Sequence, residues 1–239
     1  MKMRRLPEID LARLIHRTKS EMRLHLQAIE EGSFPALTYN PTRMVVPDLL
    51  NQQGDLLDGE PAKWEFIEEI IKKNVRKGEL ELKQNLAVSK LLHNYAIEKK
   101  IWSKRHEFFP IKIAYAGGVK FWWDLYFIEN NQAVVPFVDP RLTRGLTQED
   151  MRVVFSFMHE RIRVPGSDFE NSRLAIFQFP KRADNCRELK VTYDDGFKLY
   201  SFDELSTMVG TLYSEWDAEL AARAAAKKTK EPVVGGLFS

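Results

Sequence analysis

The amino-acid sequence predicts an α/β protein in which helices pack on one mixed β-sheet. Residues 110–138 contain three short segments rich in β-branched and aromatic residues, and turn signals separate them, so they predict three consecutive antiparallel strands. Residues 147–162 show helical periodicity, and the apolar segment 174–179 predicts a fourth strand. A strand, a helix and a strand of these lengths favour a parallel pair with a right-handed crossover.

Composition narrows the class of protein before any motif is considered. The chain has 239 residues, enough for one large domain or two small ones. Its net charge is only +2, so an argument for a nucleic-acid or membrane partner must rest on local patches. The single cysteine, Cys186, excludes an intrachain disulfide and a cysteine-rich zinc site. A single cysteine fits the reducing cytoplasm, where we expect the protein to lie. With no apolar run near the roughly 20 residues that span a bilayer, we expect it not to enter the membrane.

The first 100 residues predict helices around an irregular arm. Residues 9–31 place apolar side chains at helical spacing, and Gly32 is a suitable stop. Prolines and glycines punctuate residues 33–60, where only 44–46 suggest a short strand. Two further helices, expected from Pro61 to about residue 77 and over 80–100, should form an antiparallel pair.

Turn and capping signals define the central and C-terminal elements. Gly117-Gly118 predicts a tight hairpin turn, because adjacent glycines permit the positive φ angles that such turns need. Thr147, with Asp150 three residues later, predicts the start of a helix. The three strands are expected at 110–115, 120–128 and 133–138.

The last third of the chain predicts a hairpin and a long helix. Asp194-Asp195-Gly196 separates two short β-rich segments and is a strong hairpin signal. Ser201 and Glu204 form a capping box in front of the clearest helical period in the chain. We therefore divide the chain into an N-terminal helix and arm, a main α/β domain and a flexible tail, at residues 1–60, 61–226 and 227–239.

The order of these elements resembles the core of the restriction-endonuclease-like fold. The second expected strand carries Phe121-Trp122-Trp123-Asp124, and the third ends in Asp139-Pro140-Arg141. These residues resemble the motif of the PD-(D/E)XK nuclease superfamily, which has a metal-binding aspartate at the first place and, at the second, an acidic residue, any residue and then lysine. The resemblance covers roughly residues 80–181 and implies a restriction-endonuclease-like core, with N-terminal helices and a long C-terminal helix around it.

The resemblance implies a DNA endonuclease that depends on a divalent metal, with Mg²⁺ as the cofactor. Carboxylates on adjacent strand ends would hold the hard cation, which would polarise the phosphate and activate a water. It implies metal ligands at Asp124, Asp139 and Glu98. It implies catalytic roles for Asp124, Asp139, Arg141 and Glu107.

The same residues leave a second hypothesis open. Arg141 stands where the superfamily has lysine, and a guanidinium keeps the charge but cannot act as a base. Asp124 would then cap a hairpin, and Asp139-Pro140-Arg141 would form a strand-to-helix turn. Under this hypothesis the protein is a non-catalytic relative that kept the nuclease-like fold to bind nucleic acid or to assemble with other subunits.

Local basic residues suggest where nucleic acid would bind. The positively charged side chains around Trp102 and after the third strand suit a phosphate backbone with a stacked base, although Trp102 also suits simple packing. The predicted contacts, to DNA more than to RNA, are Lys99, Lys100, Lys104, Arg105 and Arg144. The amphipathic C-terminal helix adds a surface for a protein partner or for self-association.

Overall fold

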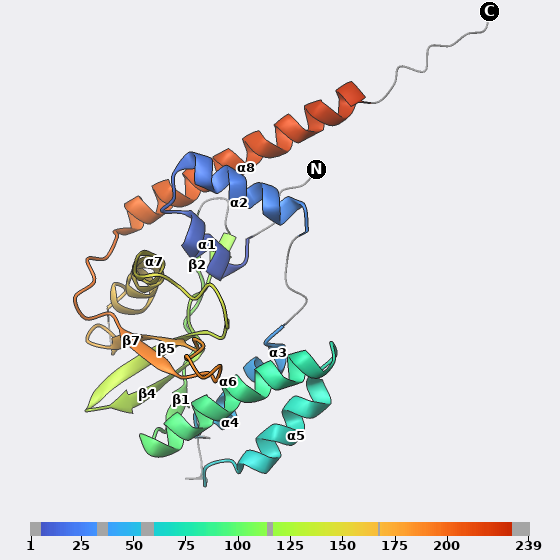
Figure 1. Cartoon of the computed structure of the whole chain (residues 1–239). Helices are drawn as coiled ribbons and strands as arrows, with labels where there is room; N and C mark the ends of the chain where they lie inside the picture. The colour runs from blue at the N-terminus through green and yellow to red at the C-terminus, as the bar shows by residue number, and fades with distance from the viewer. Residues whose placement is uncertain (1–5, 33–37, 54–59, 114–116, 167, 231–239) are drawn as a thin grey trace, which may run out of the picture.

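The protein is a three-layer arrangement of a central β-sheet between two groups of helices (Figure 1). Helices α1, α2, α7 and α8 cover one face, and helices α3 to α6 cover the other. This computed structural model describes residues 6–32, 38–53, 60–113, 117–166 and 168–230.

The central sheet has five strands in the order β1-β4-β5-β6-β7. Strands β5 and β6 are parallel and joined through α7, as the sequence predicts, and the other neighbouring pairs are antiparallel. Asn130 and Asn131, at φ 49° and 61°, form the two-residue turn between β4 and β5. The strands are β1 (Ser103–Arg105), β4 (Leu125–Glu129), β5 (Gln132–Asp139), β6 (Arg173–Gln178) and β7 (Lys190–Tyr193).

Strand β5 is almost wholly apolar because both faces of the sheet are covered. Val135 and Phe137 pack in the core beneath α1, α2, α7 and α8. The alternate residues Val134 and Val138 pack in the second core, against α4, α5 and α6. Two separate cores on the faces of one strand explain why no polar alternation is visible in this part of the sequence.

On the first face of the sheet, residues 9–31 do not form the single helix that the sequence predicts. The segment forms two helices, because Thr18 begins a new one through a capping box with Glu21. The predicted capping box of Thr147 and Asp150 at the start of α7 is confirmed. The elements are α1 (Glu8–Leu14), α2 (Lys19–Glu30), α7 (Gln148–Met158), the π-helical turn η2 (His159–Arg163) and α8 (Phe202–Lys230).

The helices on the second face include the predicted antiparallel pair, which lies side by side in Figure 1. The first of the pair begins at Trp64 rather than Pro61, and Gly78, at φ 87°, precedes the second. The expected strand over 44–46 is wrong, since these residues lie in and between two short helices. The elements are α3 (Asn40–Met44), α4 (Val46–Leu49), α5 (Trp64–Asn74) and α6 (Glu79–Glu98).

The first two predicted central strands differ from the structure. Strands β2 (Ile111–Ile113) and β3 (Gly117–Val119) pair only with each other, and β1 takes the outer position beside β4. Gly117 and Gly118 lie in β3, not in a turn, while residues 114–116 lie outside the described residues. A Cβ on Gly118 would lie 3.2 Å from Cβ of Pro110, so this glycine permits a close approach of two strands.

The predicted hairpin at Asp194-Asp195-Gly196 forms only its first strand, β7. The Asp194 carboxylate accepts hydrogen bonds from the Arg163 guanidinium and the Leu174 amide, which ties the turn to η2 and β6.

The capping box of Ser201 and Glu204 in front of α8 is confirmed. Helix α8 continues to Lys230, and residues 231–239 of the predicted tail lie outside the described residues. No helix in the described ranges is long and apolar enough to cross a bilayer.

Candidate functional site

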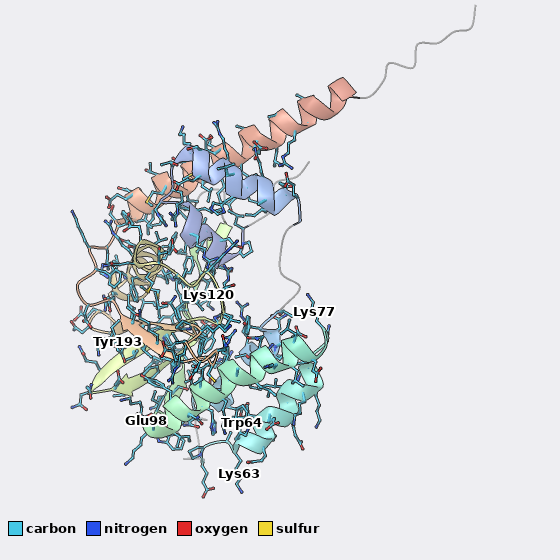
Figure 2. All side chains as sticks on the ribbon, in the orientation of Figure 1. Lys63, Trp64, Lys77, Glu98, Lys120 and Tyr193 are labelled. Carbon is cyan, nitrogen blue, oxygen red and sulfur yellow. The ribbon has the colours of Figure 1, made fainter. Side chains whose placement is uncertain are left out.

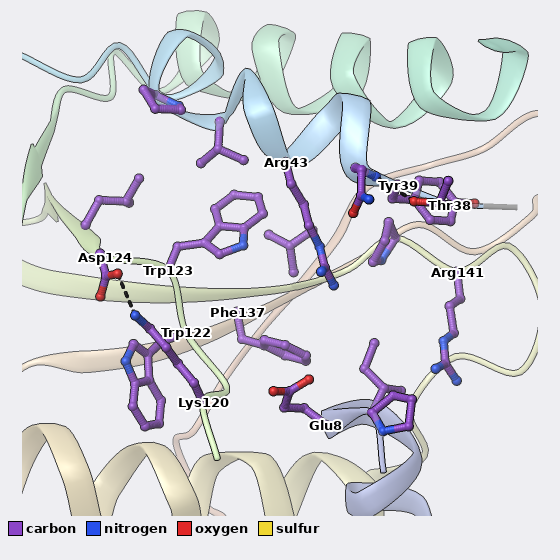
Figure 3. Close-up of a pocket in the computed structure, with 18 of the residues that line it drawn as sticks. Glu8, Thr38, Tyr39, Arg43, Lys120, Trp122, Trp123, Asp124, Phe137 and Arg141 are labelled. Carbon is purple, nitrogen blue, oxygen red and sulfur yellow. Dashed lines mark hydrogen bonds and ion pairs between the residues drawn. The ribbon is translucent and has the colours of Figure 1, made fainter. Parts of the chain in front are cut away.

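A groove of about 850 Å³ lies beside the C-terminal end of β5. Its walls come from the start of α1, from α3 and α4, from the connection between β3 and β4, and from the residues after β5 (Figure 3). Ligand sites of α/β proteins favour the carboxyl ends of parallel strands, and volumes of roughly 300–1,000 Å³ are typical. The groove is therefore the candidate functional site of the described chain.

The wall formed by α3 is fixed by a buried polar network. The Thr42 amide donates to Oδ1 of Asn85 over 3.0 Å, and the Thr42 hydroxyl donates to the same oxygen over 2.8 Å. The Ser89 hydroxyl donates to the Thr42 hydroxyl, and the Asn85 amide group donates to the Glu81 carbonyl. Thr42, Asn85 and Ser89 are buried, so breaking one bond leaves a costly unpaired group. This network holds Tyr39 and Arg43 at fixed positions on the groove wall.

Arg187 connects this wall to the end of β5. Its guanidinium donates to the Tyr39 hydroxyl over 2.7 Å, to the Gln84 side chain over 2.6 Å and to the Pro140 carbonyl over 2.9 Å. The planar guanidinium has donors in several directions and suits such a bridge. Tyr39 and Pro140 both line the groove, so Arg187 sets the spacing of two of its walls.

The opposite wall is built by the connection into β4. The Asp124 carboxylate accepts from the Phe108 amide over 3.1 Å and forms an ion pair with Lys120 (Figure 3). The Trp122 indole donates to the Phe108 carbonyl over 2.9 Å, while the Trp123 amide donates to the Pro136 carbonyl. Trp122 is buried and Trp123 is half-buried, so Trp123 offers part of its ring to the groove.

The end of β5 carries a crowded group of charges. The guanidinium of Arg141 contacts Asp10 of α1 over 3.2 Å, and Arg13 lies near enough to interact with both. Burial raises the pKa of Asp139, while the positive charge of Arg141 opposes that rise. Burial also lowers the pKa of Arg13, and the repulsion of Arg141 adds to the effect.

His16 and Asp150 form a close pair between α1 and α7. Nε2 of His16 lies 2.6 Å from Oδ1 of Asp150, and Asp150 also accepts from the Thr147 amide. Burial alone would raise the pKa of Asp150, but the hydrogen bonds from His16 and Thr147 outweigh it and hold this pKa below its usual value. The pair joins two helices of the first layer and lies outside the groove lining.

The two aspartates of the predicted motif have separate environments. Asp124 lines the groove, whereas Asp139 is fully buried and does not. The Asp139 carboxylate accepts hydrogen bonds from the Arg141 and Leu146 amides, which is the geometry of a strand-to-helix turn. Among the described residues, no three His, Cys, Asp or Glu side chains are grouped so that they could hold a metal ion.

The other predicted site residues are dispersed. Glu98 is exposed at the end of α6, and Figure 2 shows it well away from Lys120. Glu107 is exposed after β1 and does not line the groove. Of the predicted nucleic-acid contacts, Arg105 alone lines the groove. The exposed side chains of Lys99, Lys100, Lys104 and Arg144 lie elsewhere, at the end of α6, in β1 and in the loop after β5.

The contribution of the N-terminal arm to the groove was not predicted from the sequence. Tyr39 and Arg43 line the groove, although residues 33–60 were expected to form a boundary region. The prolines at positions 41 and 47 were the available signal, because Pro suits the first turn of a helix as well as a loop.

The central sheet, most of the groove lining and most of α8 lie in one stretch of sequence that matches a known family. Residues 9–226 match a family model described as sliding clamp-binding bacterial toxin SocB, so the chain belongs to this family. A relative from Caulobacter vibrioides (strain NA1000 / CB15N), the DNA replication inhibitor toxin SocB, is 32% identical over 216 residues, which is 90% of each chain. No solved structure matches the chain.

This family assignment corrects the sequence-based identification. The resemblance to PD-(D/E)XK nucleases is wrong, because the match over residues 9–226 is to a different family. The endonuclease prediction is also wrong, because the family model and the Caulobacter relative describe a clamp-binding toxin that inhibits replication. The alternative of a non-catalytic, nucleic-acid-binding nuclease relative has no support in either match. Metal binding as a property of the protein has no support in the family or in the described side chains. A role for Mg²⁺ stays an untested prediction.

Proposed function

We propose that the chain is a toxin that stops DNA replication by binding the sliding clamp. The observation that carries this proposal is the match to the Caulobacter toxin, 32% identical over 90% of each chain. The aligned region is long enough to include nearly all of the folded body rather than one shared motif. A common fold alone would not support a common function, but family membership over this length does.

The groove supports this function better than it supports an enzyme. One of its two carboxylates, Asp124, is engaged in structural contacts with Lys120 and with the Phe108 amide. Its lining combines aromatic rings and cations on a rigid frame, a composition typical of protein interfaces. Inhibition by occupation of a replication protein needs binding but no chemical step. The proposed function also requires the protein to act in the cytoplasm, where the clamp and DNA are.

The test measures clamp binding and DNA synthesis separately. We expect the purified full chain to bind the purified sliding clamp of its source organism in a calorimetric titration. We expect induced expression in that organism to reduce incorporation of labelled thymidine before total protein synthesis falls. A folded chain that shows no clamp binding, or an arrest in which protein synthesis stops first, would overturn the proposal.

A further inference from the structure

Helix α7 ends in the π-helical turn η2, and Arg163 joins this turn to two other segments. The Arg163 guanidinium donates to the Ser172 carbonyl over 2.7 Å and to the Asp194 carboxylate over 2.6 and 3.1 Å. The same carboxylate accepts a hydrogen bond from the Leu174 amide over 3.0 Å. Single π-helical turns are rare and often lie at functional sites, so the surroundings of this ion pair are a candidate site.

Two buried polar atoms beside this ion pair have no hydrogen-bond partner among the described residues. They are Nδ1 of His159 and Oγ of Ser172, and Ser172 is only 3% exposed. Ser172 directly precedes β6, and Leu174 packs in the core beneath α7, so the alternation of an extended chain places Ser172 on the same face. His159 lies four residues before Arg163 in η2, and the charges of Arg163 and Asp194 both act on its ring. Both atoms therefore lie between η2 and the start of β6.

The ion pair leaves no net charge for this site to select. The side chains of Arg163 and Asp194 are 17% and 9% exposed and neutralise each other. Burial lowers the pKa of His159, and repulsion from Arg163 adds to the effect, while Glu160 and Asp194 oppose it. The ring is therefore uncharged at neutral pH. An uncharged imidazole nitrogen and a hydroxyl suit a neutral partner that can both donate and accept a hydrogen bond.

We infer that η2, Ser172 and the turn at Asp194 enclose a binding site for one water molecule, which bridges Nδ1 of His159 and Oγ of Ser172. A polar atom buried without a partner is costly, and buried waters in proteins typically bond two to four such atoms. The bridge adds to the connection that Arg163 already makes between the end of α7, the start of β6 and the turn after β7. The site lies outside the groove lining and is independent of the proposed function.

The sign of one stability change tests the site. Ser172→Ala should lower the melting temperature by about 2–4 °C, because the water and His159 lose a hydrogen-bonded partner. If the Ser172 hydroxyl had no partner, its removal would leave the melting temperature unchanged or raise it, because an unpaired buried hydroxyl is unfavourable. That result would overturn the inference. Ser214→Ala, at an exposed position of α8, is the control and should not lower the melting temperature.

A double-mutant cycle tests whether the two side chains share one water. His159→Phe keeps a flat ring but removes both ring nitrogens, so Ser172→Ala should lower the melting temperature less in this variant than in the wild type. Ser89→Ala is the control, because the Ser89 hydroxyl donates to Thr42 on the opposite side of the sheet, and its effect should be equal in both backgrounds. An equal effect of Ser172→Ala in both backgrounds would overturn the shared water.

A high-resolution crystal structure of the full chain locates the water directly. We expect an ordered water within about 2.7–3.2 Å of both Nδ1 of His159 and Oγ of Ser172. The same crystals of Ser172→Ala should show this water weakened or lost. A direct hydrogen bond between His159 and Ser172, or another side chain in the space between them, would overturn the inference.

Discussion

The guanidinium of Arg187 donates a 2.7 Å hydrogen bond to the hydroxyl of Tyr39, which lies 148 residues earlier in the chain. The same side chain donates to the Pro140 carbonyl, so it joins the N-terminal arm to the end of the central strand β5. Its ring contact with Tyr39 adds a cation–π interaction at 5.7 Å. One half-buried arginine therefore holds together two groove walls that distant parts of the sequence supply.

Arg187→Ala should lower the free energy of unfolding by about 1–3 kcal/mol, because three acceptors lose their charged donor. The matched control is Arg182→Ala, since the exposed Arg182 side chain forms an ion pair with nearby Asp184, which is also exposed. Its effect should stay within about 0.5 kcal/mol. Chemical denaturation followed by circular dichroism measures both. Equal stability of the two variants would show that the Arg187 bridge does not hold the walls together.

Thr42→Val tests the network under α3. Valine keeps the shape of threonine but removes the hydroxyl that bonds Asn85 and accepts from Ser89, so buried polar atoms lose their partner. We expect a loss of about 1–3 kcal/mol in the free energy of unfolding. Thr207→Val is the control, because its exposed hydroxyl bonds only a carbonyl of its own helix. A similar melting temperature for both variants would contradict the prediction.

The sequence predicts the elements whose signals are local. The capping boxes at Thr147 and Ser201 and the parallel pair of β5 and β6 all follow from residues within one element or its immediate neighbour. Strand β1 has no such signal, since Ser103, Lys104 and Arg105 are polar. These residues become a strand because β4 pairs with them on one side and Gln52 on the other.

The groove could not be predicted, because contacts between distant segments create it. Arg43, Trp123 and Arg141 come from three segments, and the spacing between them depends on the Thr42–Asn85 bonds and on Arg187. The metal site predicted at Asp124 and Asp139 is absent from the described residues for a related reason. Each aspartate bonds the backbone of its own neighbourhood, a role that sequence spacing does not distinguish from metal binding.

Asp139 should make folding less favourable as pH rises. Its pKa is raised by burial, so the folded state binds a proton more tightly than the unfolded state does. The difference in stability between wild type and Asp139→Asn should therefore fall as pH rises from the ordinary value of 3.8 through the raised pKa. Urea unfolding at several pH values measures it. A difference that rises with pH would show that the carboxylate is stabilised as an anion.

The contribution of Asp150 to stability should change with pH in the opposite direction to that of Asp139. Its pKa is lowered, because the bonds from His16 and Thr147 outweigh burial, so its ionised form stabilises the folded state. That stability is fully present above the unfolded value near 3.8 and is lost as pH falls through the lowered pKa. The difference between wild type and Asp150→Asn should thus grow as pH rises from about 3 to 5. Two differences that both rise with pH would contradict the Asp139 assignment, and two that both fall would contradict the Asp150 assignment.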